Sequence, residues 1–120
     1  MDTRRLLIVE DHEPTRSVLR ALFVRKGWEV VAVGTVADGI ANLDPPPAFI
    51  ILDLDLPDGR GEAVLRRVRE ERLPTRVAIC TATADYDRWI SVARLHPEVQ
   101  LQKPIRLDEL CQAACEAVMP

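Results

Sequence analysis

Five short apolar runs recur along this chain, and each is followed by a segment whose apolar residues have helical spacing. This alternation is typical of a parallel β-sheet whose strands are joined by crossover helices. The central runs are apolar throughout, as expected of strands covered on both faces. The last run alternates apolar and polar residues, which favours an edge strand. The predicted strands are Leu6 to Val9, Glu29 to Val33, Phe49 to Leu52, Val77 to Cys80 and Val99 to Gln102.

The segments after the strands each carry an apolar stripe of the kind that packs a helix on a sheet. The first helix is expected to begin near Glu13 and Pro14, because proline is tolerated in a first turn. The second follows Thr35, a suitable N-cap residue, with Val36, Ile40 and Leu43 as its stripe. The stripes of the other three are Val64, Leu65 and Val68; Trp89, Val92 and Ala93; and Leu107, Leu110, Ala114, Ala117 and Val118. Five strands and five helices account for one domain over residues 1–120.

Composition excludes several classes of protein. With 48% hydrophobic and 29% charged residues, the chain has the composition of a globular protein and not of a disordered one. Its longest apolar runs, such as Ala48 to Leu52, are far shorter than the roughly 20 residues of a membrane-spanning helix. The amino terminus lacks the apolar region of a signal peptide, so we expect a cytoplasmic protein without membrane association. A net charge of −3 gives no reason to expect direct nucleic-acid binding.

The three cysteines are expected to be reduced thiols, because the chain shows no sign of secretion. Cys80 lies in an apolar run and is predicted to be buried. Cys111 and Cys115 lie one helical turn apart, a spacing that two metal ligands can have. No nearby histidine or third cysteine completes such a site, so we interpret the pair as structural.

The carboxyl ends of the predicted strands carry the candidate chemistry. In an open parallel sheet these ends meet at one crevice, where ligands bind. The first strand is followed by Glu10 and Asp11, the third by Asp53, the fourth by Thr81 and the fifth by Lys103. Taken singly, the threonine is better explained as an ordinary strand-end residue than as a functional one. The acid pair taken alone can also be explained as a helix cap with a first-turn acid. Their joint position at strand ends favours a shared site.

This set of side chains predicts a site for a divalent cation and a phosphoryl group. Crowded carboxylates raise one another's pKa unless a cation neutralises them, and Mg²⁺ prefers oxygen ligands and a phosphate oxygen. Lys103 and Thr81 can bind phosphoryl oxygens and stabilise the charge of a phosphoryl group in transfer. Asp53 is the candidate nucleophile, because a carboxylate can accept the group as an aspartyl phosphate.

The chain resembles the receiver domains of two-component response regulators over essentially all its 120 residues. The matching residues are Glu10-Asp11, Asp53-Leu54-Asp55-Leu56-Pro57-Asp58-Gly59-Arg60-Gly61, Thr81-Ala82 and Lys103-Pro104. The resemblance implies an α/β fold of the flavodoxin-like (CheY-like), doubly wound type. Its five-stranded parallel sheet would have the order 2-1-3-4-5, with two helices on one side and three on the other.

The resemblance also implies how such a site works. Asp53 would accept a phosphoryl group from the phosphohistidine of a sensor histidine kinase or a histidine phosphotransfer protein. Thr81 would move toward the phosphoryl group and Lys103 would pair with it, after a peptide bond that is typically cis. The domain would catalyse only its own phosphorylation and dephosphorylation, and would signal to a downstream protein or a fused effector domain. The implied Mg²⁺ ligands are Glu10, Asp11, Asp53 and the backbone carbonyl of Asp55.

One position departs from the family pattern. Most receivers carry Tyr or Phe three residues before the lysine, where this chain has Gln100. An amide buried there without partners would cost on the order of 1 to 3 kcal/mol. We therefore expect weak coupling between Thr81 and the face formed by the fourth helix, the fifth strand and the fifth helix. The alternative is a receiver-fold interaction module whose signalling depends little on phosphorylation.

Charges near the site lead to two further expectations. An acid at Asp55, two residues after the candidate nucleophile, would add negative charge near the pocket; the alternative is a solvated turn residue. The mixed charges of the third helix, which include Glu62 and Arg69, are interpreted as a solvated face.

Two other classes share part of the pattern. Haloacid-dehalogenase-like phosphohydrolases also have an aspartate nucleophile with an acid two residues on. Their metal-binding acids follow the lysine, whereas Glu10 and Asp11 precede the nucleophile here. A flavodoxin-like cofactor domain needs a Gly-, Ser- or Thr-rich phosphate cradle after the first strand, where this chain has acids. Neither class is favoured.

Overall fold

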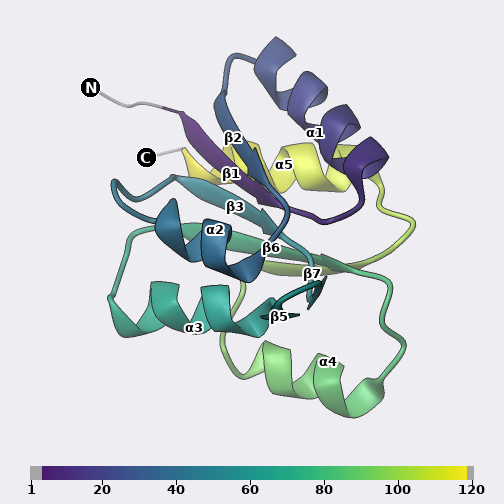
Figure 1. The fold of residues 1–120 in the computed structure, drawn as a ribbon. Helices are drawn as coiled ribbons and strands as arrows, with labels where there is room; N and C mark the ends of the chain where they lie inside the picture. The colour runs from purple at the N-terminus through teal and green to yellow at the C-terminus, as the bar shows by residue number, and fades with distance from the viewer. Residues whose placement is uncertain (1–3, 119–120) are drawn as a thin grey trace.

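A five-stranded parallel sheet forms the centre of the computed structural model, which describes residues 4–118 (Figure 1). Its strand order is β2-β1-β3-β6-β7, which is 2-1-3-4-5 when only the strands of this sheet are counted. Every neighbouring pair is parallel. The expected fold class and strand order are therefore confirmed. The strands are β1 Arg5–Val9, β2 Glu29–Val33, β3 Phe49–Leu52, β6 Arg76–Thr81 and β7 Val99–Gln102.

The observed strands differ from the predicted ones only at their ends. β6 continues through Thr81, which pairs with Gln102, so the threonine is the last residue of the strand and not the first after it. β7 lies at the edge of the sheet, as its alternating pattern predicted. A small antiparallel hairpin, β4 Asp55–Leu56 with β5 Gly59–Arg60, follows β3 and was not predicted.

The first two helices start where the sequence indicated. α1 begins at Glu13 with a proline in its first turn, and Thr35 caps α2 by accepting a hydrogen bond of 3.0 Å from the N–H of Asp38. α2 ends before Leu43, which the apolar stripe had included and which is nevertheless buried. No helix within residues 4–118 is long and apolar enough to cross a membrane. The helices are α1 Glu13–Arg25, α2 Val36–Ala41, α3 Glu62–Glu70, α4 Tyr86–Ala93 and α5 Leu107–Ala117.

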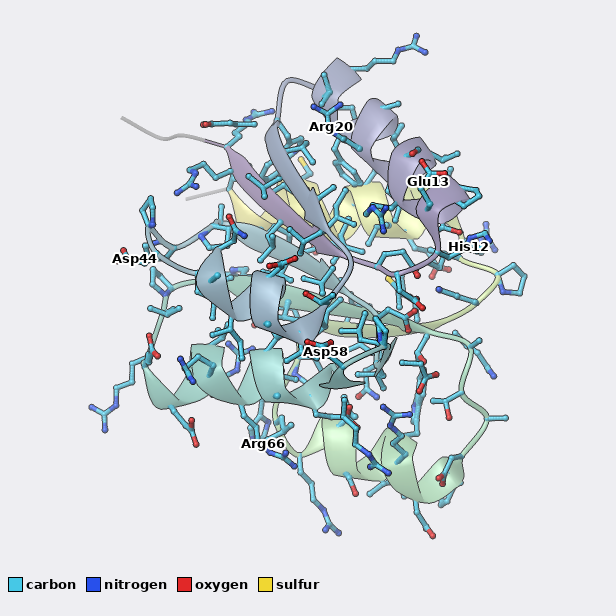
Figure 2. The ribbon with its side chains drawn as sticks, viewed as in Figure 1. His12, Glu13, Arg20, Asp44, Asp58 and Arg66 are labelled. Carbon is cyan, nitrogen blue, oxygen red and sulfur yellow. The ribbon has the colours of Figure 1, made fainter. Side chains whose placement is uncertain are left out.

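The hairpin supports α2 through Asp58, which Figure 2 labels beside that helix. The two carboxylate oxygens of Asp58 accept hydrogen bonds from the backbone N–H groups of Val36 and Ala37, at 2.8 and 3.0 Å. The first turn of a helix leaves such N–H groups without partners inside the helix. These two hydrogen bonds lower the pKa of Asp58.

The helices cover the sheet on both faces, with α1 and α5 on one side and α2, α3 and α4 on the other (Figure 1). Because successive side chains of a strand point to opposite faces, Leu6 and Ile8 pack against the first pair while Leu7 and Val9 pack against the other three. All four are at most 1% exposed. The expected division into two and three helices is confirmed, and it explains why the central strands are apolar throughout.

The cysteines are free, as predicted. Cys80 is buried, and burial raises the pKa of its thiol to about 12. Cys111 is half-buried against the core under α1 and α5, and Cys115 is exposed.

Candidate functional site

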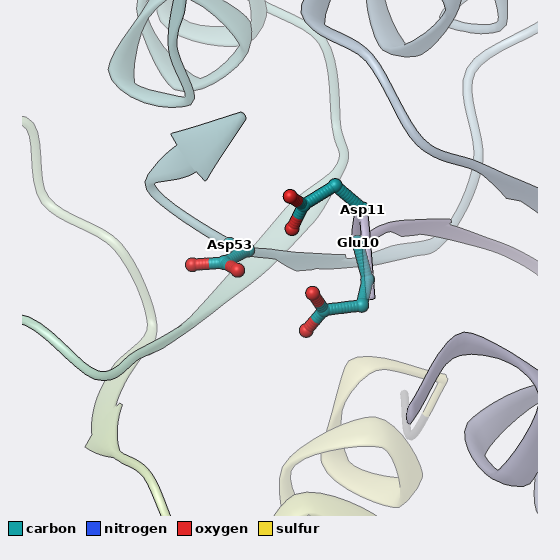
Figure 3. A group of neighbouring side chains, drawn as sticks. All are labelled: Glu10, Asp11 and Asp53. Atoms are coloured by element: carbon teal, nitrogen blue, oxygen red, sulfur yellow. The ribbon is translucent and has the colours of Figure 1, made fainter. Parts of the chain in front are cut away.

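Three carboxylates meet at the carboxyl ends of β1 and β3 (Figure 3). One oxygen from each of Glu10, Asp11 and Asp53 lies within 4.8 Å of the others, and within residues 4–118 this is the only such group of metal-ligating side chains. The backbone places them, because the N–H of Glu10 donates to the carbonyl of Val33 and that of Asp53 to the carbonyl of Val9. The expected meeting of the strand ends therefore brings these acids together.

Two of the three acids are buried and share a cation. Glu10 is 3% exposed and Asp53 is 6% exposed, whereas Asp11 faces solvent. The ammonium of Lys103 donates to Glu10 Oε1 at 2.6 Å and to Asp53 Oδ2 at 3.2 Å. Buried carboxylates require such partners, since desolvation without pairing is costly. The Lys103-Pro104 peptide is cis, as the resemblance implies.

The pairing alters the pKa of both partners. Burial raises the pKa of Glu10 above its ordinary value, although hydrogen bonds from Lys103 and the N–H of His12 oppose the rise. Burial by itself lowers the pKa of Lys103, but the contacts with Glu10 and Asp53 outweigh it and the pKa is raised. The lysine is therefore cationic at neutral pH.

The donor set fits a small, hard divalent cation. The three carboxylates outnumber the single ammonium, so the pocket keeps a negative charge that a cation would neutralise. Mg²⁺ is typically bound by one or two carboxylates together with water, and the exposed Asp11 leaves one side of the group open to water. The backbone carbonyl of Asp55 remains a predicted ligand.

Asp55 contacts Asp53 through its backbone and Arg88 through its side chain. Its backbone N–H donates to Asp53 Oδ1 at 3.3 Å, while its carboxylate accepts a hydrogen bond of 2.6 Å from Arg88. The Arg88 guanidinium compensates the negative charge that this acid brings near the pocket, and the Asp55 carboxylate is 59% exposed, in agreement with a solvated residue.

Arg88, on α4, was not identified from the sequence. It donates to both carboxylate oxygens of Glu62, at 2.8 and 3.0 Å, and to the backbone carbonyl of Leu54, at 2.7 Å. No spacing rule relates an arginine on one helix to a glutamate on another, 26 residues away. Only the folded arrangement of α3 against α4 reveals the contact.

The interpretation of the α3 charges as a solvated face is wrong for two residues. Glu62 is buried against Arg88; burial raises the pKa of Glu62, but the hydrogen bonds from Arg88 and the backbone outweigh this, and the pKa is lowered. Arg69 donates to the backbone carbonyls of Leu95, Thr75 and His96. Both charged groups pair across elements because they lie where α3 meets its neighbours.

Two further residues fix the backbone of the site. Arg16 Nη1 on α1 donates to the backbone carbonyls of Glu10, at 2.8 Å, and Asp11, at 3.5 Å. Gly61 lies so close to the end of β3 that a Cβ there would clash with the backbone carbonyl oxygen of Asp53. A side chain at this position would displace the backbone that carries Asp53, so the glycine is a steric requirement.

Thr81 is fully buried at the end of β6. Its hydroxyl oxygen accepts a hydrogen bond of 3.2 Å from the backbone N–H of Thr83. Within residues 4–118 no hydrogen bond joins Thr81 to Asp53. A role for its hydroxyl toward a phosphoryl group therefore remains a prediction.

Gln100 is half-buried on β7, and its amide is not left without a partner. Its Nε2 donates to the backbone carbonyl of Trp89 on α4 at 3.1 Å. The desolvation cost considered for an unpartnered amide is thereby offset.

An apolar groove of about 390 Å³ adjoins the site between α1 and the start of α5, and we call it the α1 groove. Lys103 belongs both to its lining and to the acidic site. Two large apolar side chains of its lining, Val18 and Leu107, are 58% and 42% exposed. The full lining is Pro14, Thr15, Val18, Leu19, Lys103, Pro104, Ile105 and Leu107.

Comparison with known proteins identifies relatives of this chain. A family model described as the response regulator receiver domain matches residues 6–115. The photosynthetic apparatus regulatory protein RegA of Cereibacter sphaeroides is 30% identical over 111 residues, which cover 92% of this chain and 60% of that protein. The transcriptional regulatory protein DltR of Streptococcus agalactiae is 34% identical over 108 residues, which cover 88% of this chain and 48% of that protein.

Solved structures of receiver domains also resemble this chain. The signal receiver domain of a putative Luxo repressor protein from Vibrio parahaemolyticus superposes with a TM-score of 0.83 at 32% identity, covering 97% of this chain and 93% of that one. The non-phosphorylated HemR receiver domain from Leptospira biflexa, at 23% identity, has the same fold with a TM-score of 0.86 and coverage of 98% and 96%. This chain spans 60% or less of the curated relatives described above. From the match over residues 6–115 and the acidic site at the ends of its strands, the chain belongs to the response regulator receiver domain family of two-component systems.

Proposed function

We propose that this domain accepts a phosphoryl group on Asp53 from a phosphohistidine, in a reaction that depends on Mg²⁺. One observation carries the proposal: the carboxylates of Glu10, Asp11 and Asp53 converge within 4.8 Å, and Lys103 bridges two of them. A nucleophilic carboxylate, two further acids and an ammonium are the groups that phosphoryl transfer to an aspartate requires.

The proposed transfer follows from the chemistry of these groups. A carboxylate oxygen of Asp53 attacks the phosphorus, the bond from phosphorus to the imidazole nitrogen breaks, and its electron pair remains on the imidazole. Lys103 Nζ, 3.2 Å from Asp53 Oδ2, is near enough to donate to an oxygen of the arriving group. Thr81 is proposed to donate to a second oxygen. Attack by water on the aspartyl phosphate would release phosphate and restore Asp53.

The proposed Mg²⁺ ligands are Glu10, Asp11, Asp53 and the backbone carbonyl of Asp55. When bound, the ion would neutralise negative charge between the carboxylates and the phosphoryl oxygens. The buried Glu10 carboxylate needs a cationic neighbour. Lys103 is shared between Glu10 and Asp53, so its single positive charge does not balance both carboxylates.

We further propose that the phosphodonor, a sensor histidine kinase or a histidine phosphotransfer protein, docks on the α1 groove. The groove adjoins Lys103, so a protein bound there would present its phosphohistidine to the acidic site. Exposed apolar residues such as Val18 and Leu107 favour a protein partner.

The output is proposed to pass through protein contacts, either to a separate protein or to an effector domain on the same chain. Relatives such as DltR are transcriptional regulatory proteins that extend well beyond the matched region. With a net charge of −3, this domain itself is not proposed to bind nucleic acid directly. An interaction module independent of phosphorylation is not favoured, because it would have no use for the buried pairing of Lys103 with Glu10 and Asp53.

Mass spectrometry tests the proposal. The protein is incubated with acetyl phosphate and Mg²⁺, and we expect one added phosphoryl group. Asp53→Asn should abolish the addition, whereas Asp87→Asn, an exposed acid on α4, should leave it intact. Equal labelling of Asp53→Asn and the unaltered protein would refute Asp53 as the acceptor.

A further inference from the structure

Arg88 contacts the peptide group that touches the candidate phosphoacceptor. The carbonyl of Leu54 and the N–H of Asp55 belong to one peptide unit. The N–H donates to Asp53 Oδ1 at 3.3 Å, and the carbonyl oxygen accepts a hydrogen bond of 2.7 Å from Arg88 Nη2. Because a peptide unit is planar, a partner that fixes its oxygen also fixes the direction of its N–H. The backbone N–H of Gly61 donates to the same carbonyl at 2.9 Å, so Arg88 and Gly61 together fix the orientation of a donor to Asp53.

The same guanidinium also determines where the Asp55 carboxylate lies. Arg88 Nη1 binds Asp55 Oδ1 at 2.6 Å, and the carboxylate is 59% exposed. Without this partner the side chain would be free to turn toward the acidic pocket, two residues from Asp53. There it would add a repelling charge to a group that already has more carboxylates than ammonium groups.

Glu62 holds Arg88 in the orientation from which it contacts the Leu54 carbonyl and the Asp55 carboxylate. Its two carboxylate oxygens bind Nε and Nη2 of Arg88 in a bidentate pair, with the arginine side chain 13% exposed and the glutamate 6% exposed. Bidentate, charge-assisted pairs of this kind hold the planar guanidinium in one orientation. The anchor leaves Nη1 and a second proton of Nη2 to reach the loop after β3.

We propose that Arg88 is a positioning residue for the phosphoacceptor: held by Glu62, it directs the Leu54–Asp55 peptide at Asp53 and keeps the Asp55 carboxylate out of the pocket. The proposal rests on the proposed function, and it assigns to α4 a part in the reaction. It applies to the unphosphorylated protein, since every contact that carries it joins residues of the chain itself.

The structure offers a matched control. Arg69 also donates to backbone carbonyls outside its own helix and to an acid in the loop before β7, namely to Leu95, Thr75, His96 and Glu98. None of these residues belongs to the acidic site. Arg88→Met and Arg69→Met therefore each remove one arginine and its interelement hydrogen bonds, but only the first disturbs the peptide next to Asp53.

The test compares the two variants with the unaltered protein in two measurements. Labelling by acetyl phosphate and Mg²⁺ should slow by about tenfold or more in Arg88→Met, as misplacement of groups at a reacting centre does. It should stay near the unaltered rate in Arg69→Met. In NMR spectra, the amide proton of Asp55 should shift upfield in Arg88→Met and not in Arg69→Met, because its hydrogen bond to Asp53 is weakened.

Arg88→Lys is the second variant, for the case that Arg88→Met does not fold. Lysine keeps the charge but lacks the planar fork, so it cannot hold Glu62, Leu54 and Asp55 together. We expect a rate between those of Arg88→Met and the unaltered protein, and a displaced Asp55 amide. The proposal would be overturned if Arg88→Lys kept both the labelling rate and the Asp55 amide chemical shift of the unaltered protein. It would also be overturned if Arg88→Met were labelled no more slowly than Arg69→Met. Absence of labelling in the unaltered protein would instead refute the proposed function, and the amide shift would still test Arg88.

Discussion

Gln100 donates a hydrogen bond of 3.1 Å to the backbone carbonyl of Trp89, which ties the edge strand β7 to α4. The amide occupies the position where most receivers have an aromatic side chain. It has a fixed partner on α4, and Arg88 holds the same helix to α3 and to the loop after β3. α4 is thus tethered from two sides, by contacts that do not involve Thr81.

We therefore predict that phosphorylation causes only modest rearrangement of α4 and β7. Amide hydrogen exchange of the protein with and without a phosphoryl mimic measures this. Protection should change around Asp53 and Thr81, and little over residues 85–103. A change over 85–103 as large as that at the site would contradict the prediction. Gln100→Ala, which removes the tether, should increase exchange in α4 before any mimic is added.

Asp58 should make the stability of the protein depend on pH through α2. Its two hydrogen bonds to the first turn of α2 lower its pKa in the folded state below the ordinary aspartate value of 3.8. A group whose pKa is lowered by folding contributes stability above its unfolded pKa, and the contribution is lost as pH falls through the folded pKa. Asp58→Asn should therefore melt below the unaltered protein at pH 7.

The difference between the two melting temperatures should shrink as the pH falls below 3.8, because the unaltered protein then loses the same charge. Thermal melts at several pH values measure it. Asp44→Asn, at an exposed acid outside the helices, is the control and should melt with the unaltered protein throughout. A constant difference at all pH values would mean that the charge of Asp58 is not what supports α2.

The α1 groove should be needed for transfer from a protein donor but not from a small one. Val18→Glu places a charge in the apolar groove, and we expect phosphotransfer from a phosphorylated histidine protein to fall by about tenfold or more. Labelling by acetyl phosphate should be unaffected. Val24→Glu, at an exposed valine of α1 outside the groove, is the matched control. Equal loss in both variants would argue against docking at the groove.

Much of the fold was predictable from the sequence because its signals are local. The strands of the central sheet are short apolar runs, and proline near the start of α1 and threonine before α2 mark helix starts. The acids Glu10 and Asp53 were predictable for a related reason: the ends of parallel strands necessarily meet at one edge. The apolar pattern of the strands and the topology of a parallel sheet were enough to place Glu10 and Asp53 at one site.

The supporting contacts were not predictable because they join elements whose packing the sequence does not specify. Arg88 pairs with Glu62 across α3 and α4, and Gln100 finds its acceptor on a neighbouring helix. Charge alternation on α3 suggested a solvated face, but burial between helices decided the outcome for Glu62. Long polar side chains have many reachable partners, and only tertiary placement selects one.

Binding of Mg²⁺ should offset the repulsion between the charges at the site. Glu10, Asp11 and Asp53 converge, and within residues 4–118 Lys103 is the one cation that hydrogen-bonds their carboxylates, so repulsion destabilises the protein without metal. A ligand that binds only the folded state stabilises it by about 1.4 kcal/mol at ten times its Kd, which raises the melting temperature of a domain this size by several degrees. Mg²⁺ should therefore stabilise the unaltered protein.

Variants of the acids separate this effect from general stabilisation by salt. Asp53→Asn removes a ligand and a repelling charge, so without metal it should melt above the unaltered protein while its response to Mg²⁺ shrinks. Asp11→Asn should behave alike, with a smaller effect of charge because Asp11 is exposed. The control is Glu70→Gln, at an exposed acid on α3, which should keep the full response. Thermal melts with and without millimolar Mg²⁺ decide the matter, and an undiminished shift in both aspartate variants would place the metal elsewhere.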